Sequence, residues 1–340
     1  MKSKKGIAIV FSVVFISSIW LTGCSKNQVK NEDEITVFRY GYTATNSDVL
    51  SGLAGIAVQE GYFEEEFKEI NVEFQGIPFV KAGPAINSAL ISGELEAAGL
   101  GDVPAIVAKA QGGSTTLVDI QPSEYSTHLI VAKDSDVMEV KDLKGKKVAV
   151  QTGSYMQRIL YQIFEKNGID VSEVELLNMS EVEAATAIVA GSIDATAVTE
   201  MKGIKLEQDG NARLLYDTEG EPNMQRLSAY VVRSDFAKEH PEVVTAYFKA
   251  LIRAQEYAQE HPEDLRDLYI KSGLEESIVD LTYPEVSDYI AITGTTEENK
   301  DIMQNVITFL KNNELITSDV DLSAWFDDSF YKQAKSEVDN

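Results

Sequence analysis

The sequence of 340 residues has one cysteine, three histidines and a marked deficit of basic side chains. A single cysteine excludes a disulfide framework and a thiolate metal site. The 30 lysine and arginine residues stand against 55 aspartate and glutamate residues, which gives a formal net charge of −25. Such a surface repels nucleic acid and anionic lipid headgroups, so we expect no nucleic-acid partner.

The common catalytic signatures are missing as well. The sequence contains no Gly-x-Ser-x-Gly elbow, no phosphate-binding loop and no His-Glu-x-x-His helix. Gly99 and Gly101 lack the third glycine of a dinucleotide fingerprint, and His240 and His261 stand at expected helix starts without metal ligands beside them. We therefore expect no catalytic residues, no cofactor and no metal ion.

Long apolar runs are absent except at the N-terminus. A lysine-rich head precedes an apolar run from Ile7 to Leu21, which is too short and wrongly flanked for a membrane span. The run ends in Leu-Thr-Gly-Cys at Cys24, which resembles the bacterial lipobox. This predicts a signal peptide over residues 1–23, lipidation of Cys24 and a polar tether over 24–34. The protein would then be anchored to the cell membrane by its lipid, on the extracytoplasmic face, and otherwise be soluble. An ordinary signal peptide with a chance cysteine is the alternative.

Two segments of the chain are rough copies of one another. Residues 88–113 align with residues 186–211 at a constant shift of 98, which pairs Gly93 with Gly191. Each copy predicts a helix end, a glycine stop, a short buried strand and a polar loop that opens another helix. About 315 residues after cleavage suggest two domains. We therefore expect two similar α/β lobes with a ligand cleft between them, at the carboxyl ends of strands.

Strands that alternate with helices predict a mostly parallel sheet in each lobe. We expect lobe I to comprise residues 35–122 and 236–340, and lobe II to comprise 123–235. The chain should cross between the lobes near 121–126, and a strand over 227–233 should return it to the hinge. Residues from His240 onward should be helical and pack on lobe I.

The order and spacing of several motifs carry a family likeness. They are the segments 79–84, 90–96 and 99–104 in the first half, then 142–150, Gly153-Ser154 and 191–195, and finally 321–330. Together they resemble the sulfonate/taurine/nitrate group of solute-binding proteins from ABC importers. The resemblance covers nearly all of the mature chain. It implies a type II periplasmic-binding-protein clamshell that captures a small molecule by lobe closure and delivers it to a permease and its ATPase.

The chain departs from this family pattern at two places. Val80 and Lys81 separate Phe79 from the Ala-Gly-Pro loop. In the second lobe, the family's aromatic segment is replaced by a stretch that ends in Thr199 and Glu200. This change counts against taurine and simple alkanesulfonates and favours a ligand with a donor group, such as an amine or a ring nitrogen. A sulfonate- or nitrate-like anion and a small nitrogenous compound both stay open, as does the related branch that carries pyrimidine or thiamin precursors.

The second lobe offers one candidate anion site. Gly153 and Ser154 begin a helix, so backbone N–H groups and the Ser154 hydroxyl could bind an anion there. Tyr155 and Arg158 follow one turn on. A plain N-cap and a solvated helix face are the alternatives.

The repeat also pairs Gly101-Asp102 with Thr199-Glu200, so we expect these residues to face one another across the cleft. Two carboxylates in one cleft would favour a cationic or hydrogen-bond-donating group. The alternative for Asp102 is the cap of its own helix.

Further candidates lie near the expected cleft mouth and the lobe crossing. Tyr42, Thr43, Phe79 and Gly83 are expected on loops at the mouth of lobe I, with core packing as the alternative for the aromatics. Thr127 and His128 stand at the crossing, where a structural role is the alternative.

Two other functions stay open. One is an enzyme on the same fold, related to thiamin-pyrimidine precursor synthesis. The other is an extracytoplasmic sensor module.

Overall fold

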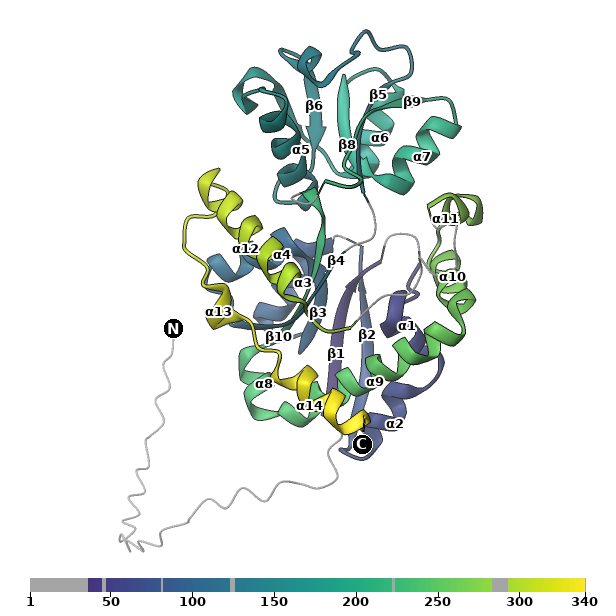
Figure 1. Cartoon of the computed structure of the whole chain (residues 1–340), viewed down its shortest axis with the longest axis vertical. Coiled ribbons are helices and arrows are strands. Elements are labelled where there is room, and N and C mark those ends of the chain that lie inside the picture. The colour runs from purple at the N-terminus through teal and green to yellow at the C-terminus, as the bar shows by residue number, and fades with distance from the viewer. Residues whose placement is uncertain are drawn as a thin grey trace, which may run out of the picture. The chain divides into compact units, whose positions relative to one another are not determined.

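The computed structural model describes residues 36–44, 47–80, 82–122, 126–221, 224–282 and 293–339 (Figure 1). The predicted signal peptide, Cys24 and the tether lie outside the described residues. Within the described ranges, no helix is both long and apolar enough to cross a membrane.

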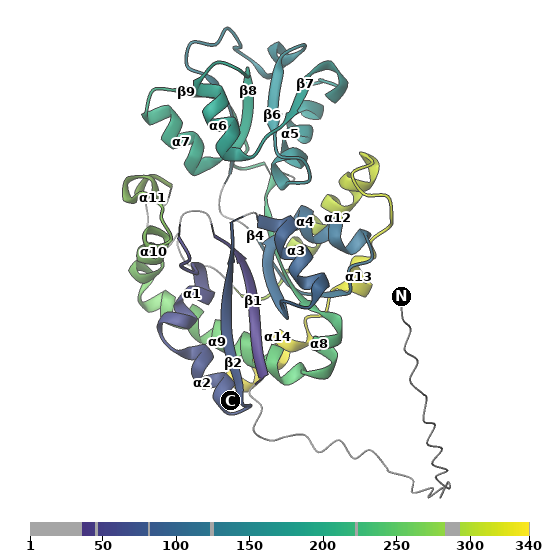
Figure 2. The ribbon, with the colours of Figure 1, turned by 180° about the vertical axis from the view of Figure 1, so that it is seen from behind.

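The strands form two five-stranded sheets, which we call the sheets of lobe I and lobe II (Figures 1 and 2). The lobe I order is β2-β1-β3-β10-β4, and the lobe II order is β7-β6-β8-β5-β9. The lobe I strands are β1 (Thr36–Thr43), β2 (Val72–Phe79), β3 (Ala97–Gly101), β4 (Thr115–Pro122) and β10 (Leu227–Arg233). The lobe II strands are β5 (Thr127–Ala132), β6 (Lys147–Val150), β7 (Glu175–Asn178), β8 (Ala195–Thr199) and β9 (Ala212–Asp217). Each sheet is mixed, because β10 and β5 run antiparallel to both of their neighbours.

Helices cover both faces of the lobe I sheet, and neighbouring strand residues alternate between two apolar clusters. One cluster joins the sheet to α1 (Gly52–Gln59), α2 (Tyr62–Lys68), α8 (Ser234–Glu239), α9 (Pro241–Glu260), α10 (Pro262–Lys271), α11 (Glu276–Thr282) and α14 (Ser329–Val338). The other joins it to α3 (Ala82–Ser92), α4 (Asp102–Ala110), α12 (Glu297–Asn312) and α13 (Leu322–Trp325). The C-terminal helices therefore complete the core of lobe I.

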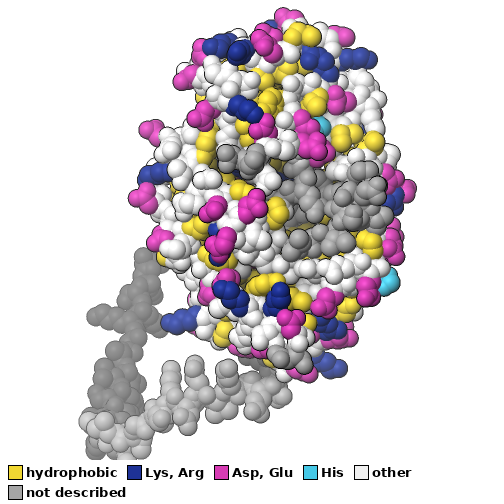
Figure 3. Space-filling view, viewed as in Figure 1, with side chains coloured by type: hydrophobic (Ala, Val, Ile, Leu, Met, Phe, Trp, Pro, Cys, Tyr) yellow, Lys and Arg dark blue, Asp and Glu magenta, His cyan; other side chains and the backbone are white. Residues whose placement is uncertain are grey.

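Lobe II has the same layered plan on a smaller scale. Its sheet packs on one face against α5 (Tyr155–Lys166) and the 3-10 turn Val140–Leu143. Its other face packs against α6 (Glu181–Val189) and α7 (Glu200–Gln208). A second 3-10 turn, Val171–Glu173, precedes β7. On the face shown in Figure 3, acidic and basic side chains are interspersed.

The sequence repeat corresponds to a structural repeat. The strand Ala97–Gly101 and the helix Asp102–Ala110 recur as Ala195–Thr199 and Glu200–Gln208, each shifted by 98 residues. Both repeat strands are the central strands of their sheets. Gly93 and Gly191 both adopt positive φ, +79° and +67°, as the expected helix stops require.

Two expectations were wrong: the lobe to which one strand belongs and the end of another strand. The strand Leu227–Arg233 falls in the range expected for lobe II, but it pairs with β3 and β4 and therefore belongs to the lobe I sheet. The chain returns to lobe I between Asp217 and Leu227, before this strand begins. β2 continues to Phe79, which was expected on a loop, because the strand stays paired with β1 to its end.

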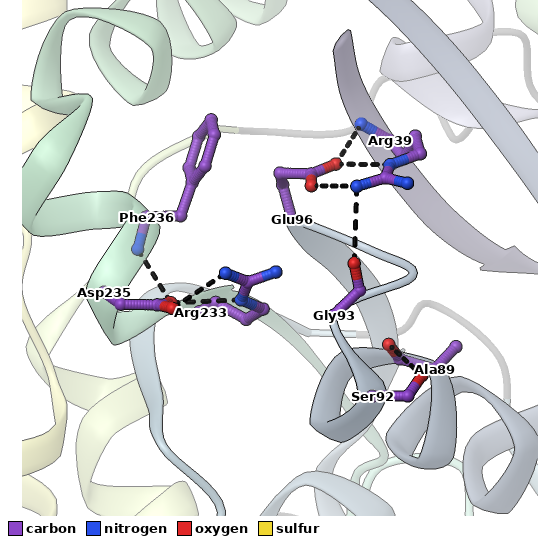
Figure 4. A network of polar contacts seen from close by, with 8 residues as sticks. All are labelled: Arg39, Ala89, Ser92, Gly93, Glu96, Arg233, Asp235 and Phe236. Atoms are coloured by element: carbon purple, nitrogen blue, oxygen red, sulfur yellow. Dashed lines mark hydrogen bonds and ion pairs between the residues drawn. The ribbon is translucent and has the colours of Figure 1, made fainter. Parts of the chain in front are cut away.

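The acidic residue of the pattern Gly-x-x-acid-Ala has the same role in both copies of the repeat, where it binds the backbone of a neighbouring strand. Glu96 accepts hydrogen bonds from the backbone N–H of Arg39, at 2.8 Å, and from its guanidinium, at 2.5 and 2.9 Å (Figure 4). Asp194 likewise accepts from the backbone N–H of Lys147, at 2.8 Å. Each acid therefore ties its central strand to the neighbouring parallel strand.

Replacing Glu96 with glutamine is expected to lower the free energy of unfolding by about 2 kcal/mol, because a charged acceptor for three N–H groups is lost. Glu96 is only 5% exposed, so water cannot replace these bonds easily. Chemical denaturation followed by circular dichroism measures the change. Glu297→Gln, which removes one partner of an exposed ion pair with Lys300, is the matched control and should change little. Equal effects for the two variants would contradict the prediction.

Candidate functional site

A cavity of about 480 Å³ lies in lobe I, beside the carboxyl ends of β1, β3 and β4. It is lined by residues of these strands, of β10 and of the first turns of α1 and α12, and by Tyr247 and Leu251 of α9 and Tyr269 of α10. Its position at the carboxyl ends of the parallel strands is where open α/β sheets bind ligands.

The cavity floor is a transverse row of residues across the sheet. Tyr230 on β10 is opposite Gly99 on β3 and opposite Asp119 on β4. Directly paired positions project on the same face of a sheet, so these three residues face the cavity together. The register between β10 and β4 shifts next to Tyr230, and this bulge gives Asp119 its place in the row.

Gly99 has no side chain, which leaves room in this row for the rings of Tyr40 and Tyr230. A Cβ atom at Gly99 would lie 2.3 Å from the hydroxyl oxygen of Tyr40 and 3.3 Å from a ring carbon of Tyr230. Two tyrosine rings therefore occupy the space that a side chain on β3 would fill. The ring of Tyr247, on α9, packs against that of Tyr40, with 5.6 Å between the ring centroids. Tyr40, Tyr230 and Tyr247 all line the cavity.

Asp119 is a buried carboxylate, only 2% exposed, at one end of the row. Its oxygens accept hydrogen bonds from the Thr295 hydroxyl at 2.7 Å, the Gln121 amide at 2.9 Å, the Ile120 N–H at 2.9 Å and the Gly294 N–H at 3.4 Å. Burial raises the pKa of Asp119, and these hydrogen bonds oppose the increase. The carboxylate thus fixes the start of the segment that leads into α12.

Arg226 is the basic residue among those that line the cavity. It directly precedes β10, and its guanidinium lies 4.8 Å above the ring centroid of Tyr155. Burial raises the pKa of Tyr155 to about 12, although the nearby Arg226 lowers it. Tyr155 packs against clusters of both lobes, so this stacked pair lies where the lobes meet.

Three of the sequence-predicted site residues line the cavity: Tyr42, Thr43 and Gly101. Tyr42 and Thr43 end β1, and the Tyr42 hydroxyl donates to the carbonyl of Asp48. Phe79 instead packs at the edge of the apolar cluster between the sheet and α3, α4 and α12. Gly83 is where α3 approaches α4, because a Cβ there would lie 2.5 Å from Pro104.

Asp102 forms an ion pair between the lobes. Its Oδ2 lies 3.0 Å from Nη2 of Arg158 on α5, and both side chains are 0% exposed. Asp102 also accepts from the N–H groups of Val103 and Leu227, and Arg158 donates to the carbonyl of Gln225. The predicted solvated or anion-facing role for Arg158 is therefore replaced by a buried structural one.

Thr199 and Glu200, which the repeat pairs with Gly101 and Asp102, make contacts within lobe II and at the crossing into it. Glu200 accepts from the N–H of Ser126, at 2.9 Å, and so holds the crossing into lobe II. Thr199 donates through its N–H and its hydroxyl to one oxygen of Glu181, at 2.7 Å each. Neither residue belongs to the lining of the lobe I cavity, as far as the described residues define it.

The groups at the start of α5 that were predicted to bind an anion instead form hydrogen bonds that cap the helix. Ser154 accepts from the N–H of Gln157 and donates to the carbonyl of Gln151. The N–H of Gly153 donates to the Gln157 side chain, at 2.8 Å. This arrangement is a helix cap closed by glutamine.

Thr127 and His128 are buried in lobe II. The Thr127 N–H donates to the Thr218 hydroxyl, at 2.8 Å, and Nε2 of His128 lies 3.6 Å from the Asp217 carboxylate. The imidazole packs on α7, where a Cβ on Gly203 would lie 2.4 Å from its Nδ1. Although burial raises the pKa of Asp217, hydrogen bonding from His128 helps to lower it to about 2.

Sequence reasoning missed several residues that line the cavity: Tyr40, Gly99, Asp119, Arg226, Tyr230 and Tyr247. One signal was available, since Asp119 interrupts an apolar strand segment, Leu-Val-Asp-Ile, where a charge needs an explanation. Across the part of the chain that the structure describes, no group of three or more His, Cys, Asp or Glu side chains could hold a metal ion.

The family model described as NMT1/THI5 like matches residues 52–265. A protein of Bacillus subtilis (strain 168), whose name refers to the binding of aliphatic sulfonates, is 26% identical over 341 residues, 98% of each chain.

Solved structures share the fold. One is from Methylobacillus flagellatus KT, and its description names a sulfonate ABC transporter and the periplasmic sulfonate-binding protein SsuA. It has a TM-score of 0.75 and 22% identity, and it covers 90% of this chain and 95% of that one. The desulfurization enzyme DSZB also matches, with a TM-score of 0.71 and 17% identity over 89% of this chain and 99% of its own. The fold therefore occurs in a binding protein and in an enzyme.

Proposed function

Because the chain belongs to the NMT1/THI5-like family, we propose that it is the extracytoplasmic solute-binding protein of an ABC importer. The cavity of lobe I captures a small molecule, the lobes close on it, and the closed form docks on the permease. The cavity beside the strand ends is the observation that carries this proposal. The relatives named for sulfonate binding support it, since one matches nearly the whole chain.

The ligand takes part in no chemical reaction in this proposal. No histidine or cysteine lines the cavity among the residues that the structure describes. The one cysteine of the sequence, Cys24, is the residue to which we assign the lipid anchor. Lobe closure then works by differential binding, because a ligand that contacts both lobes stabilises the closed state.

The full chain, extracted from membranes in detergent, tests this function. Thermal-shift screening against sulfonates, nitrate, small amines and pyrimidines should find a compound that raises the melting temperature further as its concentration increases. Isothermal calorimetry and mass spectrometry should then show reversible binding and unchanged ligand. The mass of the N-terminal peptide checks the lipid on Cys24. Conversion of the ligand to a product would contradict the proposal and favour an enzyme.

A further inference from the structure

The floor of the lobe I cavity contains a buried carboxylate that forms an ion pair with no basic residue among those the structure describes. Three acidic side chains are buried among the described residues: Glu96, Asp102 and Asp119. The first is paired with Arg39 and the second with Arg158. The third, Asp119, belongs to no ion pair of the described residues, and its four hydrogen bonds come from neutral donors.

A buried carboxylate without a cation is costly, and buried charges in proteins are normally paired. Asp119 lies against the cavity, where a ligand can supply the missing positive charge. We propose that Tyr40, Tyr230, Tyr247 and Asp119 form an ammonium subsite, and that the ligand is a small organic compound with a protonated amine. This inference rests on the proposed function and specifies the ligand class for the same cavity.

The tyrosines suit such a group. Burial, with a contribution from Asp119, raises the pKa of Tyr230 to about 12, although the charge of Arg226 lowers it. Burial also raises the pKa values of Tyr40 and Tyr247, with smaller contributions from the neighbouring tyrosines and from Asp119. The phenols therefore stay neutral, and their oxygens can accept hydrogen bonds from an ammonium group. Their ring faces add a cation–π attraction where the ligand reaches them.

The same field disfavours an anion at the floor. A nearby carboxylate that makes phenol ionisation harder also repels a sulfonate or nitrate placed beside it. The basic residue of the cavity, Arg226, directly precedes β10 and stacks on Tyr155, and its charge partly opposes the effect of Asp119 at Tyr230. An acidic group on the ligand would therefore be bound at Arg226, and the ammonium group at the floor.

Calorimetry with matched ligand pairs tests the subsite on the full chain in detergent. The panel consists of pairs of small compounds that differ only by an ammonium group in place of a hydroxyl group. It includes 2-aminoethanesulfonate with 2-hydroxyethanesulfonate, and 2-phenylethylamine with 2-phenylethanol. We expect the amine of at least one pair to bind more than 10-fold tighter than its partner.

Two variants connect this preference to the floor. Asp119→Asn removes the charge, and Tyr230→Phe removes one acceptor but keeps the ring, so the second variant remains informative if the first unfolds. Each should lower affinity for the amine about 10-fold and leave that for its ammonium-free partner nearly unchanged. Tyr161→Phe, in α5 and outside the cavity lining, is the control and should change neither.

The outcomes separate the two proposals. Amine-free sulfonates or neutral heterocycles that bind as tightly as the amines, or amine affinity unaffected by both floor variants, would overturn the ammonium subsite and leave the transport function standing. Failure of every compound in the screen to bind would overturn the proposed function and this inference with it.

Discussion

Asp102→Asn is expected to lower the free energy of unfolding by about 3–5 kcal/mol, the largest effect of any single substitution considered for this chain. The change removes the carboxylate that is paired with the buried guanidinium of Arg158. For a chain of this size, such a loss corresponds to a fall in melting temperature of roughly 10 °C. Differential scanning calorimetry measures it.

The physical reason is the complete burial of the pair. Both side chains are 0% exposed, so neither water nor salt can take over the role of the missing carboxylate. The carboxylate also accepts the N–H of Leu227 at the start of β10, which an asparagine satisfies only if its oxygen faces that way. Because Asp102 begins α4 in lobe I and Arg158 lies on α5 in lobe II, the loss weakens the junction between the lobes.

Two further variants make the result diagnostic. Asp319→Asn removes a carboxylate from an exposed pair with Lys311, in which the carboxylate side chain is 91% exposed, and should scarcely change the melting temperature. The double variant Asp102→Leu with Arg158→Met should recover much of the loss, because both charges of the buried pair are replaced by apolar side chains. A double variant less stable than Asp102→Asn would show that the charge is not the cause.

Gly99→Ala is expected to reduce affinity for the ligand found by screening about 100-fold, equivalent to roughly 2.8 kcal/mol. The new methyl would lie 2.3 Å from the Tyr40 hydroxyl, so this ring must move into the cavity. Overpacking of this kind also costs about 1–3 kcal/mol of stability. Calorimetric titration gives the affinity, and thermal unfolding gives the stability.

A second substitution separates the two effects. Gly99→Ala combined with Tyr40→Phe removes the hydroxyl that the methyl meets, so stability should recover more than affinity. The repeat shows that an alanine suits this strand position when no tyrosine opposes it, since Ala197 occupies the equivalent place on β8. Full affinity in Gly99→Ala would place the ligand elsewhere in the cavity or outside it.

The architecture could be predicted from the sequence because its signals are local. Glycine stops at Gly93 and Gly191, followed by an acid and a short apolar strand, fix the same helix–strand–helix unit twice. Leu227–Arg233 was misassigned because a strand's own residues do not show which sheet it joins. Its pairing with β3 and β4 depends on partners more than 100 residues away in the chain.

The site was harder to predict for the same reason. Asp102 and Glu200 are equivalent in the repeat, yet one pairs with Arg158 and the other holds the N–H of Ser126. The predicted cap at Ser154 is present, but it is closed by Gln157. Symmetry of sequence gives equivalent backbone positions and leaves the side-chain partners open.

The duplicated α/β plan, the expected signal peptide and the family resemblance follow from the sequence by itself, because periodicity, glycine stops and motif order act over short stretches of chain. The tertiary structure alone decided that Tyr40, Gly99, Tyr230 and Asp119 share one floor and that Asp102 pairs with Arg158. These contacts join strands and helices far apart in the chain, and pairing register and burial assign each charge its partner.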